Sequence, residues 1–264
     1  MAPSLGLPDD ALVASIDSRT EPSEEFSMSY PPVYPHDPIE EIGTEIFMVR
    51  GSIRLNPIMR ITRNMAIIRE EGELSLINPI RLNTAGETQL RSLGEVRRII
   101  RLGCFHGVDD PYYVEQFNTQ FWSQAAGTTY PNPPIDQILT SETELPFTGA
   151  ELFCFEATKQ PESALLLNRD NGILLTCDAI QHYGDYRMNN LPARLLMPFI
   201  GFPKKMIIGP LWLKFMTPKG DSLKGEFQKL LRLKFDALLS AHGSFLPSGA
   251  HAAVSRAFDS VYGS

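Results

Sequence analysis

An Asn-Gly pair between two short apolar runs constrains this chain more than any other feature. Asn171 and Gly172 separate the apolar residues 164–167 from the apolar residues 173–175. Both residues tolerate a positive φ, so the pair predicts a tight β-hairpin. The two runs are continuous and do not alternate with polar residues, which indicates strands that are covered on both faces. The chain is therefore expected to fold in layers, with this hairpin inside.

The rest of the chain repeats one order, a run of strands followed by helices. We expect strands at residues 42–49, 65–69, 74–77, 96–102, 152–155, 164–167, 173–175 and 237–239, and helices at residues 85–93, 112–122, 223–233 and 250–262. The turn at residues 70–73 predicts a second hairpin. This order favours two sheets packed face to face with helices outside, a four-layer αββα sandwich of the α/β class.

Two segments depart from this pattern. Residues 1–38 are rich in Pro, Ser and acidic residues, which predicts an extended N-terminal arm ahead of a single domain at residues 39–264. Residues 183–203 contain three prolines and are predicted to be irregular. Within them, residues 195–202 are too apolar for a free linker and are expected to pack on the domain or to line a pocket.

Composition argues against several classes of function. The 264 residues carry a net charge of −7 without a basic block, so we expect no nucleic acid and no anionic membrane as partner. No apolar run approaches the length of a membrane span, and residues 1–29 do not resemble a secretory signal. Three scattered cysteines predict reduced thiols. A cytoplasmic protein is the expectation, and the sequence carries no signal for an oligomeric state.

Polar residues gather where the predicted buried strands end. These residues are His106, Asp109, Asp110, Asp178, His182 and His242. Each alone is typical of a helix cap or a structural histidine. Together they should converge on one edge of the sheets, and His with Asp is the ligand set of zinc, iron or manganese.

The order of these residues resembles the metallo-β-lactamase superfamily over residues 42–262. His106 and Asp110 fall on the first His and the Asp of its His-x-His-x-Asp-His motif, whereas Val108 and Pro111 replace the other two histidines. Residues 158–163 resemble its next ligand turn, with Lys159 in the place of the histidine. Cys177-Asp178-Ala179 is similar to the segment of its bridging Asp, and Ala241-His242-Gly243 to that of its last His.

The resemblance implies a degenerate site. One of the two metal positions has lost two of its three histidines, and the Lys159 ammonium would repel an ion there. The second position would keep Asp110, Asp178 and His242, with His106 or His182 completing a single Zn, Fe or Mn site. Arg63–Arg69 and Ile77-Asn78-Pro79 are also similar to a branch of the superfamily that lacks most ligand histidines.

Three functions stay open at this point. The first is a metallohydrolase of a small ester, lactone, thioester or amide, with Asp110, Asp178 and Lys159 as catalytic residues. The second is a metal-free relative with a structural or ligand-binding role, in which Lys159 pairs with Asp178 or Asp110. The third is an iron-dependent non-hydrolytic enzyme. A serine nucleophile is unsupported, because no serine lies in a Gly-x-Ser-x-Gly frame.

Overall fold

The largest sheet is built from the first half of the chain. The computed structural model describes residues 30–263. Its seven-stranded sheet has the order β1-β2-β3-β4-β5-β6-β7. The strands are β1 (Glu40–Gly43), β2 (Ile46–Arg54), β3 (Arg60–Glu70), β4 (Glu73–Ile77), β5 (Glu95–Arg101), β6 (Gln120–Ser123) and β7 (Gln137–Ile138). The first four strands pair antiparallel and the last four pair parallel.

The second sheet contains the predicted Asn-Gly hairpin. Its order is β13-β10-β9-β8, from β8 (Ala150–Cys154), β9 (Ser163–Leu167), β10 (Ile173–Thr176) and β13 (Ala237–Ser240). Leu167 pairs with Ile173 across the turn, where Asn171 and Gly172 have φ values of 70° and 89°. A small third sheet pairs β11 (Ile180–His182) with β12 (Met206–Ile208).

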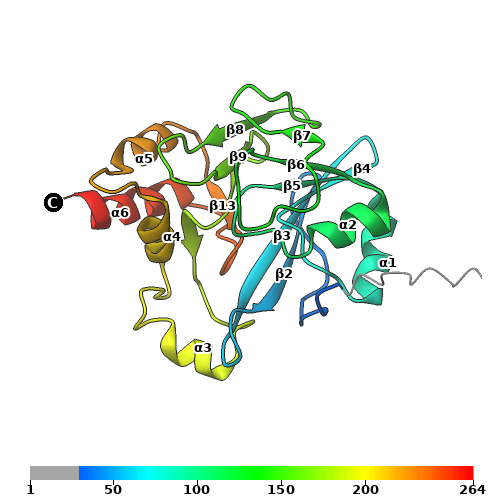
Figure 1. Cartoon of the computed structure of the whole chain (residues 1–264), viewed down its shortest axis with the longest axis horizontal. Helices are drawn as coiled ribbons and strands as arrows, with labels where there is room; N and C mark the ends of the chain where they lie inside the picture. The colour runs from blue at the N-terminus through cyan, green and yellow to red at the C-terminus, as the bar shows by residue number, and fades with distance from the viewer. Residues whose placement is uncertain (1–29, 264) are drawn as a thin grey trace, which may run out of the picture.

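Helices cover the outer faces of the two sheets, as Figure 1 shows. On one side lie α1 (Thr84–Leu93) and α2 (Asp110–Phe117). On the other side lie α4 (Pro210–Met216), α5 (Lys224–Leu230) and α6 (Ala250–Tyr262). Helix α3 (Leu191–Leu196) lies near the end of the β2–β3 hairpin. Three apolar clusters fill the spaces between these four layers. The four-layer αββα prediction is confirmed.

Strand periodicity explains how one sequence fills all three spaces. In β2, Ile46 and Met48 face the second sheet, whereas Phe47 and Val49 face the helices α1 and α2. In β9, Leu165 and Leu167 face the first sheet, and Leu166 faces the opposite helices. Continuous apolar runs are therefore required, since both faces of each central strand are buried.

Several local predictions were wrong in their extent. Phe121 and Trp122 lie in β6 and not in a long helix, because Asn118 adopts a left-handed φ of 52° and ends α2. Residues 183–203 contain helix α3, which begins at the N-cap Asn190. The structure also contains α4, β11 and β12, which the sequence pattern does not predict.

The described part of the predicted arm packs on the domain. The Tyr30 ring meets the Tyr112 ring edge to face, at 5.1 Å between centroids, and its hydroxyl donates to Glu115. Nε2 of His36 accepts a hydrogen bond from the backbone N–H of Asn83, and Nδ1 donates to the carbonyl oxygen of Asp37. Residues 1–29 of that arm lie outside the described residues.

We predict that the space between the sheets carries much of the stability. Leu165 is fully buried there, so Leu165→Ala should lower the free energy of unfolding by about 3 kcal/mol. Leu195 is 61% exposed, and the same change at that position should cost under about 0.5 kcal/mol. Urea unfolding of both variants measures the difference, and equal losses would contradict the layer assignment.

Candidate functional site

Three side chains from distant parts of the chain meet at the ends of buried strands. His106 lies in the loop between β5 and α2, Asp178 follows β10, and His242 follows β13. Strands β10 and β13 are parallel neighbours, so their ends emerge at the same edge of the second sheet. The loop after β5 approaches this edge from the first sheet.

The three side chains form a compact cluster, which we call the triangle, in which each ring faces a different oxygen of Asp178. The Nε2 atoms of His106 and His242 lie 3.1 Å apart. The Asp178 carboxylate reaches both rings, with Oδ2 at 3.3 Å from His106 Nε2 and Oδ1 at 3.2 Å from His242 Nε2. All three side chains are at most 14% exposed, so water screens this cluster weakly.

Backbone contacts between the two sheets hold His242 in place. Asn64 of β3 donates from its side chain to the carbonyls of Ser240 and Gly243, on both sides of His242. Its backbone N–H donates to Ala241 O at 2.8 Å. Gly243 has a φ of 86°, and a side chain there would collide with the backbone of His182. The turn that carries His242 is therefore fixed against strand β3.

Hydrogen bonding determines the tautomer of His242. Its Nδ1 lies 2.7 Å from the carbonyl oxygen of Thr62, which can only accept a hydrogen bond. Nδ1 therefore carries a proton, and in the neutral ring Nε2 presents its lone pair to the cluster. This arrangement is typical of histidines that bind metals. His106 differs, because its buried Nδ1 has no hydrogen-bond partner among the described residues.

Burial and the histidines set the charges of the cluster. Burial lowers the pKa of His106, which favours the neutral ring. Burial acts to raise the pKa of Asp178, but attraction and hydrogen bonds from His106 and His242 outweigh it and hold that pKa well below its usual range. Asp178 is therefore a carboxylate throughout the physiological pH range.

The triangle has the dimensions of a metal site. Ligand atoms about 2.1 Å from an ion lie about 3.0 Å apart in an octahedral site and about 3.4 Å apart in a tetrahedral one. The observed separations of 3.1–3.3 Å fall between these values. The residues present therefore fit one divalent ion.

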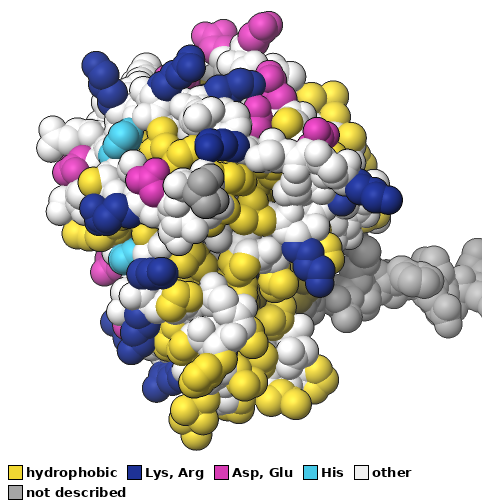
Figure 2. All heavy atoms as spheres, turned by 90° about the vertical axis from the view of Figure 1, so that its left-hand side faces the viewer, with side chains coloured by type: hydrophobic (Ala, Val, Ile, Leu, Met, Phe, Trp, Pro, Cys, Tyr) yellow, Lys and Arg dark blue, Asp and Glu magenta, His cyan; other side chains and the backbone are white. Residues whose placement is uncertain are grey.

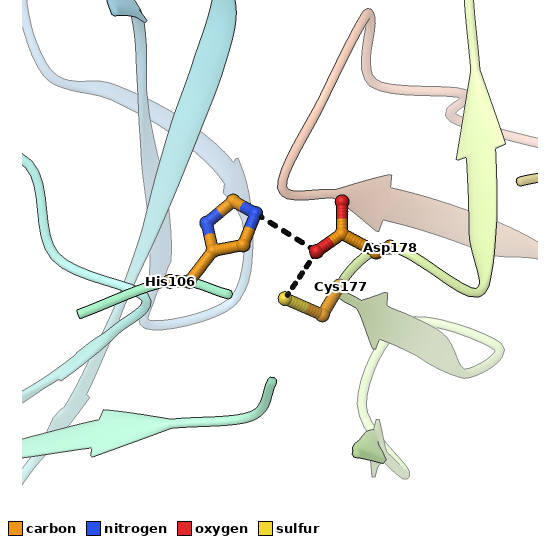
Figure 3. A group of neighbouring side chains, drawn as sticks. All are labelled: His106, Cys177 and Asp178. Atoms are coloured by element: carbon orange, nitrogen blue, oxygen red, sulfur yellow. Dashed lines mark hydrogen bonds and ion pairs between the residues drawn. The ribbon is translucent and has the colours of Figure 1, made fainter. Parts of the chain in front are cut away.

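A thiol, that of Cys177, lies beside His106 and Asp178, as Figure 3 shows. Sγ of Cys177 is 3.9 Å from Asp178 Oδ2, and Cys177, His106 and Asp178 place ligand atoms within 4.8 Å of one another. Burial raises the pKa of Cys177 well above its usual value, so the sulfur is a neutral thiol. Cys104 is similar, because burial raises its pKa to about 12.

The two aspartates that follow His106 each meet an arginine of the first sheet. Asp109 accepts a hydrogen bond of 2.8 Å from Arg63, and both side chains are buried. Asp110 is completely buried with one oxygen 3.4 Å from Arg101. Burial raises the pKa of Asp110 to about 7, although Arg101 opposes the shift. We had expected Asp110 beside Asp178, and the structure does not bring it there: Asp110 faces Arg101.

His182 and Lys159 also lie apart from the triangle. Nδ1 of His182 is 3.0 Å from the carbonyl of Ser244, and the ring borders a different cavity between β12 and α6. Lys159 is exposed, and its backbone N–H donates to Met216 O. Within residues 30–263 its ammonium forms no ion pair with Asp110 or Asp178.

Sequence reasoning missed two supports of the site. Glu162 is fully buried, where it accepts hydrogen bonds from the Trp212 indole and from the backbone N–H of Ala179, next to Asp178. Arg63 binds Asp109 and the carbonyl of Pro79. Neither residue lies within an apolar run, so the sequence carries no strong signal that either charge is buried.

The triangle borders a cavity of about 390 Å³ with mainly apolar walls. The apolar lining residues include Ile53, Leu55, Ile61, Val108, Met197, Ile200, Phe202, Leu211, Trp212 and Phe215. Among the described residues that line the cavity, Asp178 is the one carboxylate, and Arg54 and Arg63 are the Lys or Arg side chains. Residues 197–202 thus contribute to this cavity, as the apolar stretch had suggested.

Comparisons with solved structures point to one fold. The chain is similar to the DIM-1 metallo-β-lactamase, with a TM-score of 0.61 and 12% identity over 87% of this chain and 99% of that one. It is also similar to the FIM-1 metallo-β-lactamase from Pseudomonas aeruginosa in its mono-zinc form, with a TM-score of 0.60 and 9% identity over 88% and 98%. TMB-1 has a TM-score of 0.61 and 10% identity over 88% and 99%.

These similarities establish the metallo-β-lactamase fold. No protein-family model and no curated protein matches the sequence. At such low identity the fold is shared and the activity does not follow from it.

We predict that Asp110 makes the folded state less stable as the pH rises. The pKa of Asp110 is about 7 in the folded state, against an ordinary value of 3.8. Between pH 3.8 and pH 7 the folded state therefore binds one proton that the unfolded state does not. Stability should therefore fall by about 2 kcal/mol from pH 5 to pH 8 relative to Asp110→Asn. Urea unfolding of both proteins at the two pH values measures this, and parallel pH profiles would refute it.

Proposed function

We propose that this chain is a metal-dependent hydrolase that uses one divalent ion, held by His106, Asp178 and His242. The observation that carries the proposal is that the two histidine Nε2 atoms lie 3.1 Å apart and each lies 3.2–3.3 Å from an Asp178 oxygen, at the wall of an apolar cavity. The similarity of the fold to a mono-zinc metallo-β-lactamase supports it. Lys159, Asp110 and His182 are not part of the proposed ligand set.

The chain prepares these ligands before an ion arrives. The carbonyl of Thr62 keeps the proton of His242 on Nδ1 and leaves Nε2 free. Asp178 stays ionised because both imidazoles stabilise the carboxylate. A bound divalent ion would supply Lewis acidity toward a carbonyl group and would lower the pKa of a bound water.

The cavity indicates a lipophilic carbonyl compound as substrate, such as an ester, lactone, thioester or amide. Its apolar walls would hold an acyl or aromatic portion and exclude water from the reacting bond. Asp178 is the one carboxylate that could accept a proton there, and its lowered pKa makes it a weak base. Hydrolysis would therefore depend on the ion and not on the carboxylate alone.

A second candidate follows from the same residues. Two histidines and one carboxylate with open positions are the ligand set of non-haem iron(II) oxygenases. The separations near 3.1 Å suit octahedral iron as well as tetrahedral zinc. An iron-dependent non-hydrolytic enzyme is therefore the alternative to a hydrolase.

We predict that the chain binds about one equivalent of Zn²⁺, Fe²⁺ or Mn²⁺, measured by plasma emission spectroscopy after desalting. Asp178→Asn and His242→Ala each remove a ligand and should leave below about one-tenth of an equivalent. Lys159→Ala is the matched control: it should bind as the parent does and change stability by under about 0.5 kcal/mol. A parent protein that holds no ion would favour the metal-free alternative.

The two candidates differ in their response to oxygen. For the hydrolase, we predict that anaerobic purification yields a metal-loaded protein that cleaves a lipophilic nitrophenyl ester and consumes no oxygen. His242→Ala should lose this cleavage, since one of three ligands is gone. Oxygen uptake by the iron-loaded protein, measured with an electrode, together with no ester cleavage, would favour the iron enzyme.

A further inference from the structure

Basic residues are concentrated in two segments of this chain, although its net charge is negative. The whole chain has a net charge of −7, yet residues 186–220 contain six Lys and Arg residues and no Asp or Glu. Residues 46–69 also lack acidic residues and contain five arginines. These two segments form the β2–β3 hairpin and the region from α3 to α4.

Several of these cations have no counter-charge nearby. Four of them form ion pairs with acidic residues: Arg50 with Asp185, Arg63 with Asp109, Arg69 with Glu45 and Arg187 with Asp37. Seven others form no ion pair with another described residue: Arg54, Arg60, Arg194, Lys204, Lys205, Lys214 and Lys219. This part of the molecule therefore presents a positive potential to its surroundings.

The same segments expose most of the large apolar side chains. Of twelve such exposed residues among those described, nine lie here: Leu55, Ile58, Leu191, Leu195, Leu196, Phe199, Ile200, Leu211 and Phe215. Phe199 is 88% exposed and Ile58 is 67% exposed. Figure 2 shows apolar side chains gathered toward the lower end of one face, with Lys and Arg around them. A soluble monomer rarely exposes such a patch without a partner.

Contacts hold the two segments together as one surface. Asn190, the N-cap of α3, donates from its side chain to Ile58 O at the tip of the hairpin. Met59 and Ile61 pack with Ala193, Met197 and Phe202 behind the exposed residues. We call this surface, formed by residues 54–60, 191–205 and 211–219, the basic apolar face.

The candidate site opens on the basic apolar face. Leu55, Ile200, Leu211 and Phe215 are exposed and also line the cavity that contains His106, Asp178 and His242. Whatever covers this face therefore lies at the mouth of the cavity.

We infer that the basic apolar face docks on an anionic lipid surface. Exposed apolar side chains surrounded by Lys and Arg are typical of proteins that bind at the membrane interface, where each cation near anionic lipid contributes about 1 kcal/mol. A second copy is a poor occupant, because the same cations would face one another across the interface. Phe199 protrudes and lines none of the cavities described on this face, so it fits a lipid layer better than an extended peptide.

This inference extends the proposed function by naming where its substrate comes from. A protein docked in this way would admit a lipid-soluble carbonyl compound directly from the bilayer into the cavity. That step rests on the proposed function, whereas the docking itself does not. No helix among residues 30–263 has the length and apolar content to cross a membrane.

The experiment is co-sedimentation of the full chain with vesicles, without any substrate. Phosphatidylcholine vesicles that contain about 30% phosphatidylglycerol should bind the chain at least tenfold more tightly than pure phosphatidylcholine. Raising the salt from about 0.1 M to about 1 M should weaken this binding, since it shortens the Debye length from about 10 Å to about 3 Å.

Variants separate the apolar and the charged contributions. Phe199→Ser should weaken binding about tenfold, and Lys204→Gln with Lys205→Gln about 25-fold. Ile138→Ser and Lys234→Gln are matched controls, exposed but outside this face, and should bind as the parent does. His242→Ala should also bind vesicles normally, so loss of the metal site and loss of docking are distinguished.

Equal binding to both kinds of vesicle would overturn the inference, as would variants of the face that bind like their controls. Sedimentation velocity on the same proteins tests the other occupants. A parent that dimerises, and a Phe199→Ser variant that does not, would assign the face to a second copy and also overturn it. Thermal unfolding of each variant checks that it is folded. If Phe199→Ser does not fold, the variant with Lys204→Gln and Lys205→Gln still tests the inference, because both lysines are exposed.

Discussion

The Asp178 carboxylate is nearly removed from water, and the fold around it is arranged to keep it charged. An ionised carboxylate in such a place is costly unless it has close partners. Its partners are His106 and His242, at 3.3 Å and 3.2 Å. These residues follow strands of different sheets, so the face-to-face packing of the sheets is a condition for the cluster. Removal of either ring would strand a buried charge.

Close packing of backbone around the cluster makes this convergence possible. A side chain at Gly103 would lie 2.6 Å from Sγ of Cys177, so only glycine lets the loop before His106 approach β10. Asn64 joins β3 to both sides of His242 by hydrogen bonds. The geometry of the triangle is therefore set by the sheets, and the three side chains need little rearrangement to accept an ion.

The sequence predicts the layers well because burial on both faces leaves a clear pattern. The Asn-Gly hairpin and α6 appear at the predicted residues, as does the helix that Asn83 caps. Strand β6 was missed because Phe121 continues a helical spacing of aromatic residues, and the left-handed Asn118 that ends α2 has no strong signal.

The site is predictable only in part, for a different reason. The spacing of apolar residues predicts where a strand ends, but it does not predict the direction in which the next side chain points. His106, Asp178 and His242 meet, whereas Asp110 is only four residues beyond His106 and faces Arg101. Lys159 occupies a position that the resemblance had placed near a metal, yet its side chain is exposed.

The arginines of the first sheet bear on the proposed single-ion site. Arg63 binds Asp109 and Arg101 faces Asp110, so both carboxylates after His106 are neutralised away from the cavity. Two neutral histidines and Asp178 would leave one bound divalent ion with a net charge of about +1, in a cavity of low polarity. A positive centre of this kind stabilises the negative charge that develops on a carbonyl oxygen during hydrolysis. A second carboxylate ligand would cancel that charge, so the contact of Asp110 with Arg101 agrees with the proposed catalysis at a single ion.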